Sequence, residues 1–114
     1  MQFTLKQGAT FRVEMDLQDD AGDPLDLTDY TLTCELRQEV VDVTRTYPLV
    51  LELSVTILDI AAGLIQIEAL PADTAAWPVG CLVFDVEMTD GAGDVTYTPT
   101  GTVTVCERIT NNGG

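Results

Sequence analysis

The chain has 114 residues, and its 19 acidic residues against 5 basic ones give a formal net charge of -14 at pH 7, with no histidine. This length predicts one domain whose core needs neither disulfides nor a metal. The charge argues against DNA and RNA as partners, because their binders need a basic patch.

The cysteine set and the hydropathy point to a protein that folds in a reducing cytoplasm. Cys34, Cys81 and Cys106 form an odd set without CxxC spacing, which favours neither a disulfide framework nor a zinc site. The first residues lack the basic and apolar regions of a signal peptide, and no segment has the apolar length of a membrane span. Later oxidation of one cysteine pair is left open.

Apolar and polar residues alternate with a period of two along most of the chain, which predicts half-buried antiparallel strands. A short edge strand is expected at 3–5 and a longer strand at 10–17. The Asp, Gly and Pro residues of 19–24 predict a turn. Another strand is expected at 31–38, where Cys34 faces inward as a small apolar residue.

The middle of the chain holds the clearest strand pattern. Segment 39–46 fits either a loop or a short edge strand. Every odd position from 49 to 57 is apolar, and a turn at 59–63 and a strand at 64–69 follow. Pro71 predicts a single helical turn within 71–77 that Pro78 cannot continue, and Trp77 is expected to plug one end of the core.

The last third of the chain predicts two or three further strands. Leu82, Phe84, Val86 and Met88 point inward from a strand at 81–88, and the glycine-rich segment 90–94 predicts a hairpin loop. Strands at 95–97 and 101–108 follow, broken near Pro99. Residues 111–114 are expected to form a flexible C-terminal tail.

About seven strands and one short helical turn near 71–77 predict an all-β fold, with a single β-sandwich domain over 1–110. Two apolar sheet faces must cover each other, so the pattern favours an antiparallel sandwich or a small barrel. We prefer the sandwich, Ig-like in outline. The cysteine and tryptophan positions do not match those of antibody domains.

Short turn and strand motifs are spread through the chain: Gln7-Gly8-Ala9-Thr10-Phe11, Leu17-Gln18-Asp19, Gly22 to Tyr30, Glu35-Leu36-Arg37, Gly63-Leu64-Ile65, Trp77-Pro78-Val79-Gly80, Phe84-Asp85-Val86, Asp90 to Asp94 and Gly101-Thr102-Val103. Together they resemble the N-terminal domain of phage baseplate upper proteins. The resemblance implies a part of a virion and no reaction. Because the chain stops at residue 114 without a fibre or receptor-binding segment, an adaptor or decoration role is expected instead of host recognition.

No catalytic or cofactor-binding residues are predicted. The absence of histidine removes the usual general base and the commonest metal ligand, and the GxSxG, GxxxxGK[ST] and GxGxxG motifs are missing. Gly91-Ala92-Gly93 matches only the opening of a dinucleotide loop, and a hairpin turn is the better interpretation.

The many carboxylates are interpreted as a solvated sheet face, because Glu14, Asp16, Asp85 and Glu87 fall on outward positions. The acidic cluster within 19–26, formed by Asp19, Asp20, Asp23 and Asp26, could hold calcium. Its spacing is not that of an EF-hand, and no metal site is predicted.

The remaining candidates for binding a partner lie on the outward positions of the strands. Hydrogen-bonding groups are expected there at Arg12, Thr31, Thr33, Arg37, Thr102 and Thr104, with the arginines pairing to acids across strands. Val50 and Val83 fall among the polar positions and could be covered by a partner. The edge strand at 3–5 or the C-terminal strand could add to a neighbour's sheet.

The favoured function is therefore a non-enzymatic bacteriophage virion structural protein. Such a subunit binds other virion proteins in many symmetric copies, as a capsid decoration or cement protein or as a tail or baseplate adaptor. It would be assembled in the host cytoplasm, and its acidity would keep it away from packaged DNA. The alternative is a free-standing carbohydrate-binding or cell-surface Ig-like module, for which Tyr30, Tyr47, Tyr97 and Trp77 are the available aromatic residues.

Overall fold

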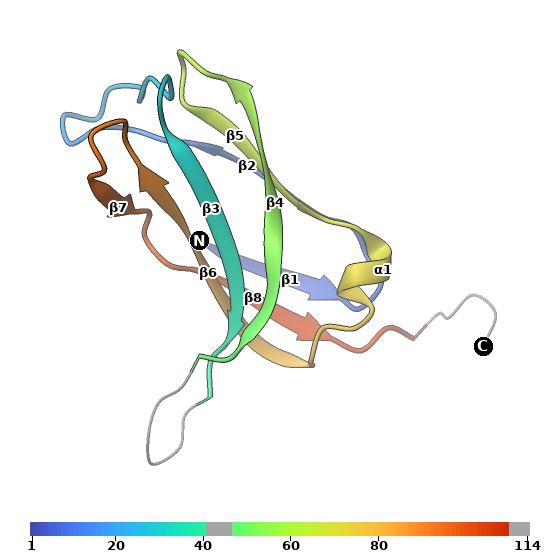
Figure 1. Ribbon diagram of the computed structural model, residues 1–114. Coiled ribbons are helices and arrows are strands. Elements are labelled where there is room, and N and C mark those ends of the chain that lie inside the picture. The colour runs from blue at the N-terminus through green and yellow to red at the C-terminus, as the bar shows by residue number, and fades with distance from the viewer. Residues whose placement is uncertain (41–46, 110–114) are drawn as a thin grey trace.

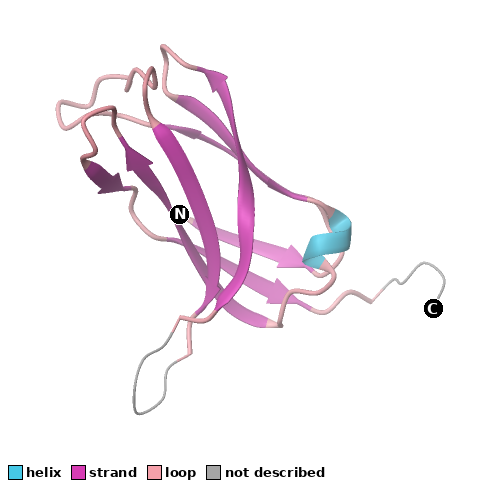
Figure 2. Cartoon of the chain, viewed as in Figure 1, coloured by secondary structure: helices cyan, strands magenta, loops and turns pink. Residues whose placement is uncertain are grey.

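The computed structural model describes residues 1–40 and 47–109, and nearly all of its regular structure is β-strand (Figure 1, Figure 2). The elements follow in chain order as β1 (Gln2–Lys6), β2 (Phe11–Asp16), β3 (Thr31–Gln38), β4 (Leu49–Asp59), β5 (Leu64–Ala69), α1 (Pro71–Thr74), β6 (Gly80–Thr89), β7 (Val95–Tyr97) and β8 (Gly101–Cys106). The predicted all-β fold is confirmed.

The strands form one 8-stranded sheet that is nearly closed into a barrel. Its order is β1-β8-β6-β3-β4-β5-β2, and β7 also pairs with β6. All of these pairings are antiparallel except that of β1 with β8, which is parallel. β4 joins the two halves of the sheet, because it pairs with β3 up to Leu53 and with β5 from Ser54 onward.

The predicted element bounds agree closely with the structure. Strands β3, β5 and β7 occupy the predicted ranges, β1, β2 and β6 differ from them by one residue at each end, and β4 extends two residues beyond its predicted end. The helical turn is shorter than expected and ends at Thr74, while β8 ends at Cys106. The segment 39–46, left open between loop and strand, lies largely outside the described residues, as does the tail 111–114.

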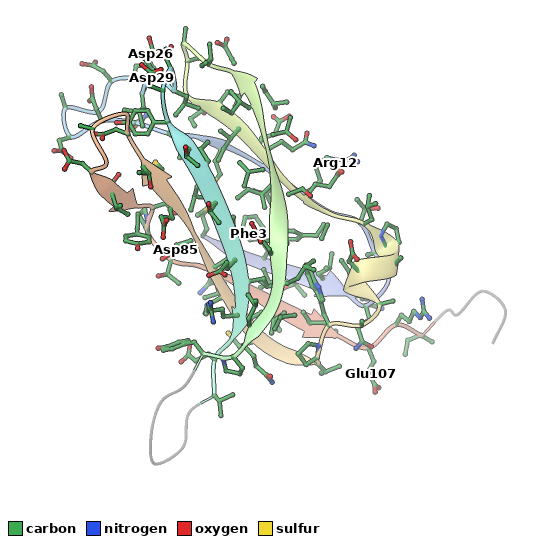
Figure 3. All side chains as sticks on the ribbon, viewed as in Figure 1. Phe3, Arg12, Asp26, Asp29, Asp85 and Glu107 are labelled. Atoms are coloured by element: carbon green, nitrogen blue, oxygen red, sulfur yellow. The ribbon has the colours of Figure 1, made fainter. Side chains whose placement is uncertain are left out.

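Aromatic side chains from both ends of the sheet meet in the core. Phe3 of β1 lies in the interior (Figure 3), with its ring centroid 5.9 Å from that of Phe11 on β2 and 6.2 Å from that of Phe84 on β6. Trp77 packs on Phe11 at 5.8 Å and is 2% exposed, as predicted for a residue at the core. Its indole N–H is buried without a hydrogen-bond partner among the described residues.

The turn that contains α1 is anchored to the loop between β1 and β2. Thr74, fully buried, donates a hydrogen bond from its hydroxyl to the Ala9 carbonyl at 2.7 Å. The Gln7 side-chain amide donates to the Trp77 carbonyl at 2.7 Å. These two bonds satisfy buried polar groups and hold Trp77 against the core.

The apolar odd positions of β4 do not all lie in the core. Only Leu53 is buried, whereas Leu49 and Ile57 are exposed. The pairing register shifts at both ends of the strand, leaving Val50 and Leu58 without a directly opposed partner. Such β-bulges change the face on which the following side chains lie. Val50, expected on the polar face, packs partly against the core.

The C-terminal strand is not a free edge, which corrects one of the two expected attachment sites. β8 lies between β1 and β6, so both of its sides are paired. The predicted break near Pro99 separates β7 from β8, which pair with successive parts of β6. The Thr98 hydroxyl fills the gap by accepting a hydrogen bond from the Val86 N–H at 2.9 Å.

Within the described residues, no helix is both long enough and apolar enough to cross a membrane.

Candidate functional site

A groove of about 460 Å³ lies on the outer surface of the sheet, over β3, β6 and β7. Asp85, one of its residues, lies beside the β3 and β6 ribbons (Figure 3). The lining residues come from three strands and the segments next to them, and they are Thr33, Glu35, Arg37, Glu39, Tyr47, Val83, Phe84, Asp85, Glu87, Tyr97 and Thr100.

The period of two along each strand explains why these side chains share one surface. On β3 and β6 the even positions Cys34, Leu36, Phe84 and Val86 are buried in the core, so the odd positions face outward. The register then sets Glu35 opposite Asp85, and Thr33 opposite Glu87. The antiparallel pairing of two strands distant in sequence thus creates a row of carboxylates.

Hydrogen bonds fix several of the groove side chains. The Arg37 guanidinium lies 2.9 Å from a Glu35 carboxylate oxygen, and it also donates to the Tyr47 carbonyl at 2.9 Å. The Tyr97 hydroxyl donates to the Glu87 carboxylate at 3.1 Å. These bonds tie Tyr47, just before β4, and β7 to the groove.

The like charges in the groove change the acidity of its members. Partial burial and the neighbouring Glu87 and Glu35 carboxylates raise the pKa of Asp85 above its ordinary value. The hydrogen bond to Glu87 and the charge of that residue raise the pKa of Tyr97. The groove is therefore a site of negative potential that disfavours anionic ligands.

Of the four aromatic residues available for a sugar platform, two lie in or against the core and two line the groove. Trp77 is buried in the core, and Tyr30 is only partly exposed and packs against it. Tyr47 and Tyr97 are 42% and 58% exposed, and both line the groove. Two of the four residues are thus removed from any platform, and the other two are brought to one surface.

The acidic loop 19–26 uses its carboxylates for backbone hydrogen bonds. One Asp19 oxygen accepts from the N–H groups of Ala21 and Asp23, each at 3.0 Å. One Asp26 oxygen accepts from the Thr28 N–H and hydroxyl, and these bonds lower the pKa of Asp26. In the part of the chain that the structure describes, no group of three or more acidic or cysteine side chains is placed to hold a metal.

The cysteines are separate free thiols. Cys34 is fully buried between β4 and β6, as predicted, and burial raises the pKa of its thiol to about 12. Cys81 faces outward on β6 opposite Thr104, while Cys106 lies at the end of β8. No cysteine pair is bonded.

The outward arginines pair with acids, one of them across strands as predicted. Arg12 on β2 lies opposite Glu68 on β5, with 2.6 Å between guanidinium and carboxylate, and it points away from the interior (Figure 3). Arg37 instead pairs with Glu35 of its own strand. Val83, expected to be open to a partner, is half-buried in the groove wall.

A comparison with models of known protein families and a search of curated proteins each found no match to this chain.

The alternation in the sequence predicts outward positions for Arg37, Asp85 and Glu87, but it does not predict the groove. The missing information was the pairing of β3 with β6, which lie far apart in the sequence. The usable signal was the polar content of the outward positions on these two strands, with tyrosines just beyond them.

Proposed function

We propose that the chain is a non-enzymatic structural protein of a bacteriophage virion. In this role it is an accessory subunit that binds other virion proteins in many symmetric copies, either as a capsid decoration or cement protein or as a tail or baseplate adaptor. It folds in the host cytoplasm, resides in the virion, and uses protein partners in place of nucleic acid or membrane.

The resemblance to the N-terminal domain of phage baseplate upper proteins carries this proposal. The motifs behind it include residues with definite structural roles. Asp29, in the segment Gly22 to Tyr30, has a positive φ of 66°. Leu27 of the same segment is 1% exposed. Such residues determine the backbone conformation and the core, so the resemblance concerns the scaffold of the domain. We also propose that the sheet forms an Ig-like sandwich, in which β4 belongs to both layers because it pairs first with β3 and then with β5.

The free edge of β1 offers a means of assembly. The Met1 carbonyl accepts from Thr102 N–H, and the Gln7 N–H donates to the Cys106 carbonyl. Because alternate residues of a parallel strand bond to the same neighbour, these two bonds direct the backbone groups of Phe3 and Leu5 toward β8. Those of Gln2 and Thr4 then face outward, where they can pair with a strand of another subunit, whereas the Lys6 carbonyl already accepts from the Ala9 N–H.

The first test of the proposal is the content of purified particles from the host that carries the gene. We expect the chain to sediment with the particles and to be present in many copies each, as measured by quantitative mass spectrometry. A chain that remains in the unassembled fraction while particles form would reject the virion role.

A second test concerns the β1 edge. Thr4→Pro removes an outward N–H without removing a bond to β8, so the fold is expected to survive, whereas pairing of β1 with another subunit is blocked. We expect this variant to be lost from the particles. Thr4→Val, which keeps the N–H and suits a strand, is the control and should assemble normally. Normal assembly of a folded Thr4→Pro protein would exclude β1 as the contact.

A further inference from the structure

We infer that the groove over β3, β6 and β7 binds a neutral oligosaccharide. This inference goes beyond the virion role and does not depend on it, because it rests on the shape and chemistry of the groove alone. Concave surfaces with aromatic walls and a few convergent polar groups are the usual form of ligand sites.

The two tyrosines lie toward opposite ends of the groove. Tyr97 is opposite Glu87, near the Thr33 end of β3, whereas the Tyr47 carbonyl is bonded to Arg37, four residues further along that strand. At about 3.4 Å per residue, the positions of Thr33 and Arg37 on β3 are about 14 Å apart. A short chain of sugar rings can span this distance. Exposed tyrosines suit such a ligand, since each has an apolar face for ring C–H groups and a polar hydroxyl.

Between the tyrosines lie the hydrogen-bonding groups that sugar hydroxyls require. The carboxylates of Glu35 and Asp85 are acceptors, the Arg37 guanidinium is a donor, and the Thr33 hydroxyl is both. The bond from Arg37 to Glu35 and the bond from Tyr97 to Glu87 hold these groups in place before a ligand arrives. Preorganisation of this kind reduces the entropic cost of binding.

The charge of the groove selects among ligands. Its carboxylates outnumber its single guanidinium, so a sulfated, phosphorylated or sialylated glycan would be repelled. A basic peptide is the competing occupant. Glu35 is already paired with the Arg37 guanidinium, which leaves fewer uncompensated carboxylates to attract a cationic chain. A neutral ligand therefore fits the groove better.

The experiment is a titration of the ¹⁵N-labelled 114-residue protein with cellohexaose, maltohexaose and chitohexaose, followed by NMR. With each sugar raised to about 10 mM, millimolar affinities are detectable. We expect at least one sugar to shift the amide signals of Thr33, Glu35, Asp85, Glu87 and Tyr97. Sialyllactose, which is anionic, should leave them in place. No shift with any of the three neutral sugars, or equal shifts with sialyllactose, would overturn the inference.

Variants test whether the tyrosines carry the binding. Tyr97→Ala is expected to weaken the affinity for the sugar about tenfold. Val95→Ala removes another exposed apolar side chain from the same strand but lies outside the groove, so it should bind normally. Unfolding curves verify that both variants are folded. Undiminished binding by folded Tyr97→Ala, or shifts in these amides with an oligolysine peptide and not with the sugars, would also overturn the inference.

Discussion

Single residues show how burial and charge divide the titratable groups of this protein into inert and responsive ones. Cys34 is enclosed by the core, whereas Cys81 is exposed on the outer surface of the same sheet. Asp85 is only partly covered but lies among like charges. The difference in burial between the cysteines affects their reactivity. The like charges around Asp85 affect the pH dependence of stability.

Alkylation should distinguish the cysteines. Since the thiolate is the reactive form, a buried thiol whose pKa is raised to about 12 reacts slowly at neutral pH. We expect iodoacetamide to modify Cys81 in the native protein and to spare Cys34. In urea both should react, which provides the control. Modification of Cys34 at the unfolded rate in native buffer, detected by mass spectrometry of peptides, would contradict the described core.

The raised pKa of Asp85 has a definite sign for stability. A folded-state pKa above the unfolded value favours folding when the group is protonated, below the ordinary aspartate pKa, and this contribution is lost as the pH rises through the folded pKa. Asp85→Asn should therefore stabilise the protein at neutral pH by about 0.5 kcal/mol, the size of a cross-strand like-charge effect.

The gain from Asp85→Asn should shrink as the pH falls through the raised pKa of Asp85, and it should be smallest at about pH 4 and below, the ordinary aspartate range. Urea unfolding at both pH values measures the difference. Asp20→Asn, in an exposed loop, is the matched control for loss of one negative charge. If Asp85→Asn destabilised the protein at neutral pH, the proposed repulsion would be refuted.

Among the elements, the loop between β2 and β3 rests on the turn between β4 and β5. The Leu17 N–H donates to the Gly63 carbonyl at 2.8 Å, and the Leu27 N–H donates to the Ile60 carbonyl at 2.8 Å. Asp26 and Asp29 mark this loop at the top of the molecule (Figure 3). Close backbone contact at Gly63 makes the junction sensitive to any added side chain.

Gly63→Ala should disrupt this junction. A Cβ there would lie 2.6 Å from the Leu17 carbonyl oxygen and 2.7 Å from that of Leu25, and the φ of +67° is unfavourable for alanine. We expect a loss of about 3 kcal/mol or more. Gly22→Ala has a φ of +84° but no neighbour within 4 Å, so only about 1 kcal/mol of backbone strain is expected. Equal losses in urea unfolding would argue against the contact at Gly63.

The strand pattern could be predicted wherever alternation is uninterrupted, as in β3 and β5. It failed in β4, because bulges at Val50 and Leu58 and a change of partner after Leu53 are set by neighbouring strands and leave no local signal. The groove could not be predicted for a related reason. The outward positions of Glu35 and Asp85 follow from periodicity, but their proximity depends on a pairing between distant strands.

The molecule as a whole has far more negative charge than its ion pairs compensate. The salt bridges seen between described residues are Arg12–Glu68 and Arg37–Glu35. The net charge of -14 therefore opposes the compact state through self-repulsion. Screening by salt should relieve this repulsion.

Raising the NaCl concentration from about 10 mM to about 150 mM shortens the Debye length from roughly 30 Å to 8 Å. We expect the melting temperature to rise, by about 4 °C for each kcal/mol that screening adds to the free energy of unfolding. Potassium chloride at equal ionic strength is the control and should give the same rise, since screening does not depend on which monovalent cation is used. A melting temperature that falls or does not change would show that repulsion is unimportant.

The parallel pairing of β1 with β8 joins residues 2–6 to residues 102–106. A nascent polypeptide cannot form this ladder until β8 has left the ribosome, so β1 stays unpaired while the roughly hundred residues between them are made. Contacts between such distant positions slow folding because a large loop must close first. Each new molecule thus passes through an interval in which the part of β6 that pairs with β8 and the aromatic ring of Phe3 are still uncovered.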